Sequence, residues 1–383
     1  MPGTGTSPEI PLFDLRLAPE DIAAVADTLR SGWLTMGPRT AAFEEAFAAQ
    51  LGARHAVAVS SCTAALHLAY LAAGVGPGDE VIVPSFTFAA TASAALYCGA
   101  SPVFADILGR ENPSLDPADV EARITPRTKA VCVVHFAGYA ARVDELRTLC
   151  DRTGIALIED VAHAPSASLG DRKLGTWGLA GAFSFFANKI LSAGEGGLLA
   201  TDDDDVAALA RSLRSHAMTS GTWSRHTGVT TTYDVVGLGF NYRIDELHSA
   251  LLSSRLTRLE DDIARRRELT RDYRAKLAGI DGLVVPYADD EVETSSCYVM
   301  PVFVEDPARW AAVRDHLRFE RGVQTSLFYP AVHQFSAYAE LHGGARLPHT
   351  ELASASELTI PLYPHMTTAQ LDHVVGAIAE ALA

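Results

Sequence analysis

Short apolar runs alternate with longer segments of helical pattern through the first half of the chain, from about residue 55 to 200. Such runs suit strands buried on both faces of a parallel sheet, and they occupy residues 81–83, 102–104, 130–134 and 156–158. The segments between them predict helices over residues 63–73, 88–97 and 143–153. Strand and helix repeated in this order predict an α/β fold, with a mainly parallel central sheet flanked by helices.

A different pattern begins near residue 244. Leucine and isoleucine recur every three to four residues from Leu247 to Ile263, ahead of three arginines at 265–267 and a glycine at 279. This spacing predicts one long amphipathic helix, with the arginines on its solvated face. Two strands, at 295–303 and 322–328, and a closing helix at 366–382 are predicted beyond it. We therefore expect an N-terminal arm (1–15), a large domain (16–254) and a smaller α+β C-terminal domain (255–383).

Composition narrows the class of protein. Hydrophobic residues make up 48% of the 383 positions and charged residues 20%, as in soluble globular proteins. The net charge of −16 disfavours nucleic acid and anionic membranes as partners. No apolar run is long enough to span a membrane, the first residues do not resemble a signal peptide, and the five cysteines show no CxxC spacing. We expect a cytoplasmic protein, and no ligand-spaced histidine pair indicates a metal site.

Two charged residues stand at unusual positions. Lys189 lies between an aromatic apolar segment and a glycine-dense turn at 194–197. Burial lowers the pKa of an amine, and a neutral amine can form a Schiff base. Asp160 ends the apolar run that begins at Ile155, at the edge of the sheet where α/β proteins bind ligands. It is placed either to meet a cationic group or to cap the next helix.

Two further segments suggest a planar, phosphorylated ligand. Residues 57–68 pass from a strand through small hydroxyl residues into a helix, whose N-terminus could hold a phosphate or could simply be capped by a serine. Phe88 follows the strand at 81–83 and could lie against a planar ring or pack into the core. A lysine, an aspartate, an aromatic residue and a helix N-terminus together match the requirements of pyridoxal phosphate.

Longer motifs carry a resemblance. The chain resembles the DegT-type family of sugar aminotransferases, which belong to the fold type I pyridoxal-phosphate enzymes, over nearly its whole length. The matching segments are residues 31–38, 77–84, 159–160, 183–185 with Lys189, 194–197, 239–243, 329–330 with His333, and 360–362. Cys62 departs from the pattern, because the family usually has glycine there.

The resemblance implies a role for each matching residue. Lys189 would carry pyridoxal phosphate covalently, Asp160 would pair with its ring nitrogen, and His163 would lie near its phenolic oxygen. The phosphate would be surrounded by Cys62, Thr63 and Ser184, with Phe88 on the ring and Asn241 reaching in from a neighbouring subunit. Substrate contacts would come from Thr35, Arg243, Tyr329 and His333. The resemblance thus implies a homodimer with shared active sites, and pyridoxamine phosphate as the second cofactor form.

The implied reaction is transamination, since related dehydratases have histidine in place of Lys189. The amino group would pass from L-glutamate to a nucleotide-activated keto-deoxysugar, in amino sugar or antibiotic biosynthesis. Candidate cations for the nucleotide are Arg211, Arg214, Arg225 and Arg243, and the segment 215–234 is expected to fold over the substrate. The alternative is a glutamine-dependent keto-cyclitol aminotransferase. A nicotinamide oxidoreductase is disfavoured because no GxGxxG string is present, and a non-catalytic regulator because Lys189 and Asp160 are both retained.

Overall fold

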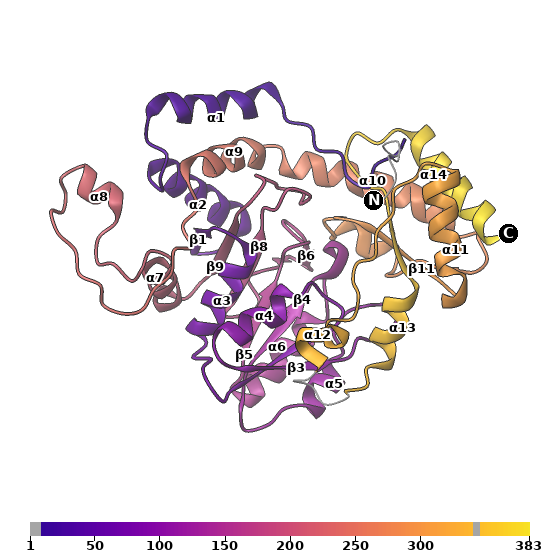
Figure 1. Ribbon diagram of the computed structural model, residues 1–383, viewed down its shortest axis with the longest axis horizontal. Coiled ribbons are helices and arrows are strands. Elements are labelled where there is room, and N and C mark those ends of the chain that lie inside the picture. The colour runs from indigo at the N-terminus through magenta and orange to yellow at the C-terminus, as the bar shows by residue number, and fades with distance from the viewer. Residues whose placement is uncertain (1–8, 340–344) are drawn as a thin grey trace.

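A seven-stranded sheet forms the centre of the computed structural model, which describes residues 9–339 and 345–383 (Figure 1). Its strand order is β1-β9-β8-β5-β4-β2-β3. β9 runs antiparallel to both of its neighbours, and every other neighbouring pair is parallel. The strands are β1 (His55–Val59), β2 (Glu80–Pro84), β3 (Ser101–Ala105), β4 (Thr128–Val134), β5 (Ala156–Asp160), β8 (Ala180–Ser184) and β9 (Gly197–Thr201). The predicted α/β fold with a mainly parallel sheet is confirmed.

Helices cover both faces of this sheet, which explains why most residues of its strands are apolar whichever face they point to. Alternate residues belong to different core clusters: Val57, Val81 and Val83 face one side, while Ala56 and Ile82 face the other. The first side is covered by α3 (Cys62–Ala72), α4 (Ala90–Tyr97) and α7 (Asp204–Leu213). The second is covered by α2 (Pro38–Leu51), α6 (Val143–Thr153) and α9 (Glu246–Leu256).

A smaller antiparallel sheet lies toward the C-terminus, formed by β10 (Leu283–Val284), β11 (Met300–Val304) and β12 (Glu357–Ile360). The helices around it are α10 (Leu259–Leu277), α11 (Trp310–Asp315), α13 (Pro348–Ser356) and α14 (Thr368–Leu382), the last as predicted. The remaining elements are α1 (Pro19–Ser31), α5 (Pro117–Ala122), α8 (Thr222–His226), α12 (Ser336–Ala339), and the short hairpin of β6 (Ser168–Leu169) and β7 (Arg172–Lys173). The domain boundaries stay a prediction, and residues 1–8 of the expected arm lie outside the described residues.

The predicted long helix is wrong in one respect, because it is broken at residues 257–258 into α9 and α10. Arg258 leaves the helical conformation, with φ −114° and ψ 5°. Its guanidinium pairs with Asp21 at 2.6 Å and Glu20 at 2.9 Å, both on α1. The prediction of a solvated arginine face is also wrong for Arg266, which is buried and donates to the carbonyls of Tyr298 and Leu362.

Two predicted strands differ from the structure. The strand expected at 295–303 begins only at Met300, because the preceding residues bond to the loop around Ala137 instead. The Tyr298 amide donates to the Ala137 carbonyl at 2.9 Å, and Cys297 adopts a positive φ of 47°. The strand expected at 322–328 is reduced to isolated bridges, of Val323 with Ile10 and of Ser326 with Thr359. No helix in the described parts of the chain is long and apolar enough to cross a membrane.

Candidate active site

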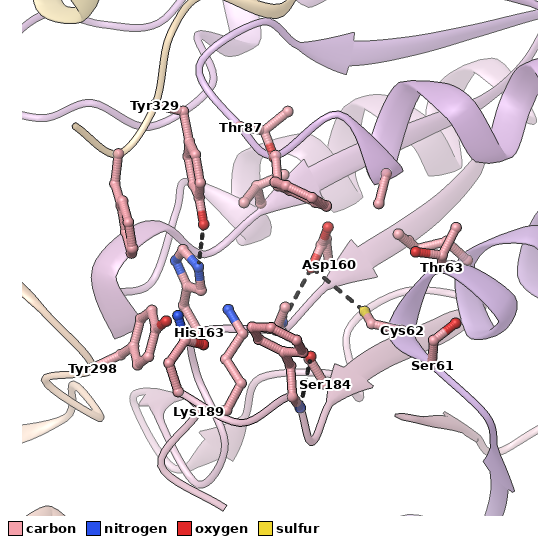
Figure 2. A pocket seen from close by; sticks show the side chains of 18 of the residues that line it. Ser61, Cys62, Thr63, Thr87, Asp160, His163, Ser184, Lys189, Tyr298 and Tyr329 are labelled. Carbon is pink, nitrogen blue, oxygen red and sulfur yellow. Dashed lines mark hydrogen bonds between the residues drawn. The ribbon is translucent and has the colours of Figure 1, made fainter. Parts of the chain in front are cut away.

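A cavity of about 380 Å³ opens at the carboxyl ends of the parallel strands. Figure 2 shows side chains from β5, the residues after β8 and the start of α3 pointing into it. Eight of the predicted site residues line this cavity: Cys62, Thr63, Phe88, Asp160, His163, Ser184, Lys189 and Tyr329. Four do not: Thr35, Asn241, Arg243 and His333.

Lys189 projects into the cavity from a tight turn after β8. Its backbone amide donates to the Phe186 carbonyl at 2.8 Å. The buried Arg255 fixes the following residues by donating to the carbonyls of Ile190 and Ser192. Burial lowers the pKa of the Lys189 amine from 10.5 to about 8, while the charge of Asp160 opposes this shift. Near neutral pH the neutral, nucleophilic form of the amine is therefore a minor fraction, but a far larger one than in an exposed lysine.

Asp160 ends β5 and is almost fully buried. Its Oδ1 accepts a hydrogen bond from the Ala162 amide at 3.1 Å and a weak one from Cys62 Sγ at 4.0 Å. Its Oδ2 accepts from Thr91 Oγ1 at 2.9 Å. Burial raises the pKa of Asp160, and the bonds from Ala162 and Thr91 oppose that rise by stabilising the carboxylate. Sequence reasoning missed Thr91, because a threonine in an alanine-rich helix carries no local signal of function.

The start of α3 forms another wall of the cavity. Ser61 caps the helix, since its side chain accepts from the Ala64 amide at 3.1 Å. The amides of Cys62 and Thr63 have no acceptor within the helix, because the first turn of any helix leaves its N–H groups free. Gly197 on β9 permits this approach of strand and helix, since a Cβ there would lie 2.4 Å from the Cys62 nitrogen. Capping and anion binding, the two alternatives for this segment, are thus compatible here.

Aromatic side chains surround the mouth and one side of the cavity. Phe88 is 62% exposed, and its ring centroid lies 6.1 Å from that of Tyr329. His163 packs against Tyr298 with the rings tilted by 34° and their centroids 4.4 Å apart, and its Nε2 lies 2.8 Å from the Tyr329 hydroxyl. Burial, assisted by the charge of Lys189, holds the pKa of His163 well below 6.5, so the imidazole is neutral.

The predicted residues outside the cavity have other surroundings. His333 is buried and its Nδ1 lies 2.7 Å from Ser85 Oγ, directly after β2. Thr35 and Asn241 are exposed. The Nη1 atom of Arg243 is buried with no hydrogen-bond partner among the described residues.

The arginines predicted as cations for a nucleotide also lie outside the cavity. Arg214 is buried and pairs with Glu44, so the expectation that it binds a nucleotide is not supported by its position. Arg225 lies over the ring of Tyr233, 4.7 Å from its centroid. None of the four predicted arginines lines the cavity, which is bordered by neutral and acidic side chains apart from Lys189.

The cavity fits pyridoxal phosphate on three independent counts. It offers a buried amine whose pKa is lowered, a buried carboxyl group that accepts hydrogen bonds from Ala162 and Thr91, and a helix N-terminus whose first amides have no acceptor within the helix. The sequence model of the DegT/DnrJ/EryC1/StrS aminotransferase family matches residues 16–379. The chain belongs to this family.

Individual relatives agree with this assignment. The chain is 39% identical over 369 residues to the spore coat polysaccharide biosynthesis protein SpsC of Bacillus subtilis (strain 168), covering 94% of each protein. It is similar to the solved structure of DesV from S. venezuelae in complex with a ketimine intermediate, at 36% identity, a TM-score of 0.89 and 98% coverage of both chains. It is also similar to the aminotransferase TlmJ of Streptoalloteichus hindustanus, at 35% identity and a TM-score of 0.90, over 97% of this chain and 98% of that one.

Membership of this family confirms the resemblance seen in the motifs. The protein is a pyridoxal-phosphate-dependent aminotransferase of fold type I. Its cofactor is pyridoxal phosphate, for which the cavity supplies the groups described above.

Proposed function

We propose that this enzyme transfers an amino group from L-glutamate to the keto group of a nucleotide-activated keto-deoxysugar, in amino sugar or secondary-metabolite biosynthesis. The observation that carries the proposal is the position of the Lys189 amine in a cavity that also holds Asp160 and opens past Phe88. An open mouth suits a substrate whose keto sugar enters while its bulky nucleotide stays outside. The polysaccharide-related name of SpsC supports a sugar as acceptor.

Different residues would hold different parts of the cofactor. When bound, pyridoxal phosphate supplies an aldehyde that condenses with amines and a heterocycle that accepts the electrons of a breaking Cα–H bond. The carboxylate form of Asp160, which the hydrogen bonds from the Ala162 amide and Thr91 stabilise, would hold a proton on the ring nitrogen through its negative charge. The amides at the start of α3, with the hydroxyls of Thr63 and Ser184, would bind the phosphate.

Lys189 then acts as both nucleophile and proton carrier. Its neutral form would bind the cofactor covalently and, once displaced by the amino donor, would take the proton from the substrate Cα. The resulting ammonium group would be stabilised by a cation–π interaction, because Nζ lies 4.5 Å from the centroid of the Tyr298 ring. From there it can donate the proton to the former aldehyde carbon of the cofactor. A pKa of about 8 suits both roles, since the group gains and loses its proton near physiological pH.

A second copy of the chain is part of the proposal. Asn241 and Arg243 lie outside the cavity of their own chain, and the segment before them projects from the body of the molecule around α8 (Figure 1). This projecting segment, residues 219–238, exposes the apolar side chains of Val229, Val236 and Leu238. Association with a second subunit would bury them and would let Asn241 reach the partner's cofactor phosphate.

The decisive experiment is an assay of the purified holoenzyme. Half-reactions with L-glutamate and with L-glutamine, followed by the loss of cofactor absorbance, identify the donor. The amino form of the enzyme is then offered 4-keto-6-deoxy and 3-keto nucleotide hexoses and keto cyclitols, with mass spectrometry of the products. We expect glutamate as donor and a nucleotide sugar as acceptor. Amination of a keto cyclitol alone, or use of glutamine alone, would refute the proposed substrates but not the aminotransferase activity.

A further inference from the structure

The hydrogen bonds around His163 determine which of its ring nitrogens carries the proton. The backbone N–H of Ala137 donates to Nδ1 at 3.3 Å. A ring nitrogen that accepts a hydrogen bond carries no proton of its own, so the proton of the neutral ring is on Nε2. The ring does not gain a second proton, because burial and the nearby Lys189 oppose a positive charge at this position.

This assignment also determines the direction of the bond to Tyr329. Nε2–H donates to the Tyr329 hydroxyl oxygen, 2.8 Å away, and the hydroxyl cannot donate its own proton back to a protonated nitrogen. Within residues 9–339 and 345–383 the Tyr329 hydroxyl has no second hydrogen-bond partner. Figure 2 shows this hydroxyl directed toward His163 at the side of the cavity that Lys189 also faces. The one proton that Tyr329 can donate is therefore free for a ligand in the cavity.

The backbone conformation at Ala137 holds its amide in position to donate to His163 Nδ1. Ala137 has φ 56°, in the left-handed region that a residue with a Cβ rarely adopts. The loop is held from both sides, since the Ala137 carbonyl accepts from the Tyr298 amide at 2.9 Å and the adjacent Gly138 carbonyl accepts from Ser295 Oγ. This conformation is what aims the Ala137 amide at His163.

We infer that Tyr329, rather than His163, is the hydrogen-bond donor that this cavity offers to an oxygen atom of its ligand. His163 is then a positioning residue, which acts on the ligand only through Tyr329. The acceptor is an oxygen lone pair, either on the phenolic oxygen of the cofactor or on the substrate. The inference rests on the proposed function only for the identity of that substrate.

Four variants test the inference. Tyr329→Phe removes the hydroxyl and keeps the ring. His163→Phe keeps a ring stacked between its aromatic neighbours but loses both hydrogen bonds, whereas His163→Gln keeps an N–H donor toward Tyr329. Tyr338→Phe is the matched control, because its hydroxyl bonds to Ser93 outside the cavity. Melting temperatures verify that all four variants fold. If His163→Phe does not fold, Tyr329→Phe and His163→Gln are enough to test the inference.

Two probes distinguish the source of the oxygen. With pyridoxal phosphate alone, the dissociation constant and the pH titration of the bound cofactor's absorbance report on the phenolic oxygen. The KM for L-glutamate and for the keto sugar reports on a substrate oxygen. We expect Tyr329→Phe and His163→Phe to raise the same constant, either the dissociation constant of the cofactor or the KM of one substrate, by about tenfold. The constants of His163→Gln should stay close to those of the wild type, and those of Tyr338→Phe should be unchanged.

The same measurements can overturn the inference. It fails if Tyr329→Phe changes neither probe. It also fails if the wild-type titration contains a step between pH 5.5 and 8 that disappears in His163→Gln, because His163 would then carry the titrating proton itself. The cofactor measurement needs no substrate, so a change there stands even if no nucleotide sugar is turned over.

Discussion

The amine of Lys189 lies over the face of the Tyr298 ring, 4.5 Å from its centroid. Attraction between a cation and an aromatic face favours the protonated amine, whereas burial favours the neutral one and brings its pKa to about 8. The charge of Asp160 also favours the protonated amine, and the balance of these effects sets the pH at which Lys189 loses its proton.

This balance predicts the pH dependence of cofactor binding. The rate at which cofactor-free enzyme condenses with pyridoxal phosphate should rise with pH through about 8 and level off above it, as the neutral amine accumulates. Tyr298→Phe keeps the aromatic face and the midpoint. Tyr298→Leu removes about 1 kcal/mol of stabilisation from the ammonium form and lowers the midpoint by somewhat less than one pH unit. Stopped-flow absorbance measures the rate, and a wild-type midpoint near 10 would contradict the prediction.

Lys189→Ala should abolish covalent attachment of the cofactor and reduce turnover by at least about a thousandfold, because nucleophile and proton carrier are lost together. Borohydride reduction followed by peptide mapping should label residue 189 in the wild type and no residue in the variant. Lys129→Ala, at an exposed position of β4, is the control and should keep both label and activity. A label found at any other lysine would overturn the assignment.

Thr91→Val should shift the acid limb of the pH–kcat profile to higher pH by about one unit. The variant removes a hydrogen bond that stabilises the Asp160 carboxylate, so the pKa of Asp160, already raised by burial, rises further. Because the active form is the carboxylate, activity is lost as the pH falls through that pKa. Thr91→Ser retains the hydroxyl and should restore the wild-type limb. If both variants instead lower kcat equally at every pH, Thr91 has only a packing role.

Glu357→Gln should change how stability depends on pH. Glu357 is fully buried, and its carboxyl group accepts from the Phe328 amide at 2.6 Å and from Thr359 Oγ1 at 2.5 Å. Burial raises its pKa well above 4.5, so above that pH the unfolded chain loses a proton that the folded chain retains. Stability therefore falls as the pH rises from 4.5 toward the folded-state pKa, and the glutamine variant lacks this contribution. Thermal unfolding between pH 5 and 8 should show a smaller decline in the variant, and parallel curves would refute the argument.

Leu238→Glu should weaken the proposed dimer. Leu238 is 95% exposed in the single chain, and burying a leucine contributes about 1.5–3 kcal/mol, so its replacement by a charge should weaken association by tenfold or more. Light scattering coupled to size-exclusion chromatography should show a shift toward monomer, with a parallel loss of activity. Phe319→Glu replaces an exposed aromatic residue after α11 and is the control. A Leu238→Glu protein that stays dimeric would place the interface elsewhere.

Local patterns in the sequence were enough to predict several parts of this site. Asp160 and Lys189 stand out because each interrupts an apolar run at the end of a strand, and the parallel sheet then brings such ends to one edge. The start of α3 was predicted for the same reason, since a strand leading into a helix is recognisable over a dozen residues. These features depend on neighbours in the sequence, and the structure places all of them in one cavity.

Other features could not be read in this way, because the contacts that create them join distant parts of the chain. Thr91 and Asp160 are 69 residues apart, and His163 and Tyr329 are 166 apart. Arg266 seemed to lie on a solvated face, yet two carbonyls from separate segments bury it. His333 shares a motif with Tyr329 but turns to Ser85, since the chain after Pro330 packs against the end of β2.

The sequence alone determined the fold class and singled out Lys189 and Asp160 as the candidate amine and carboxylate, because hydrophobic periodicity and strand ends are local properties of the chain. Only the tertiary structure decided the protonation states, the partners of Asp160 and the direction of the His163–Tyr329 bond. Those depend on burial and on hydrogen-bond geometry, which come into existence when segments far apart in the sequence are packed together.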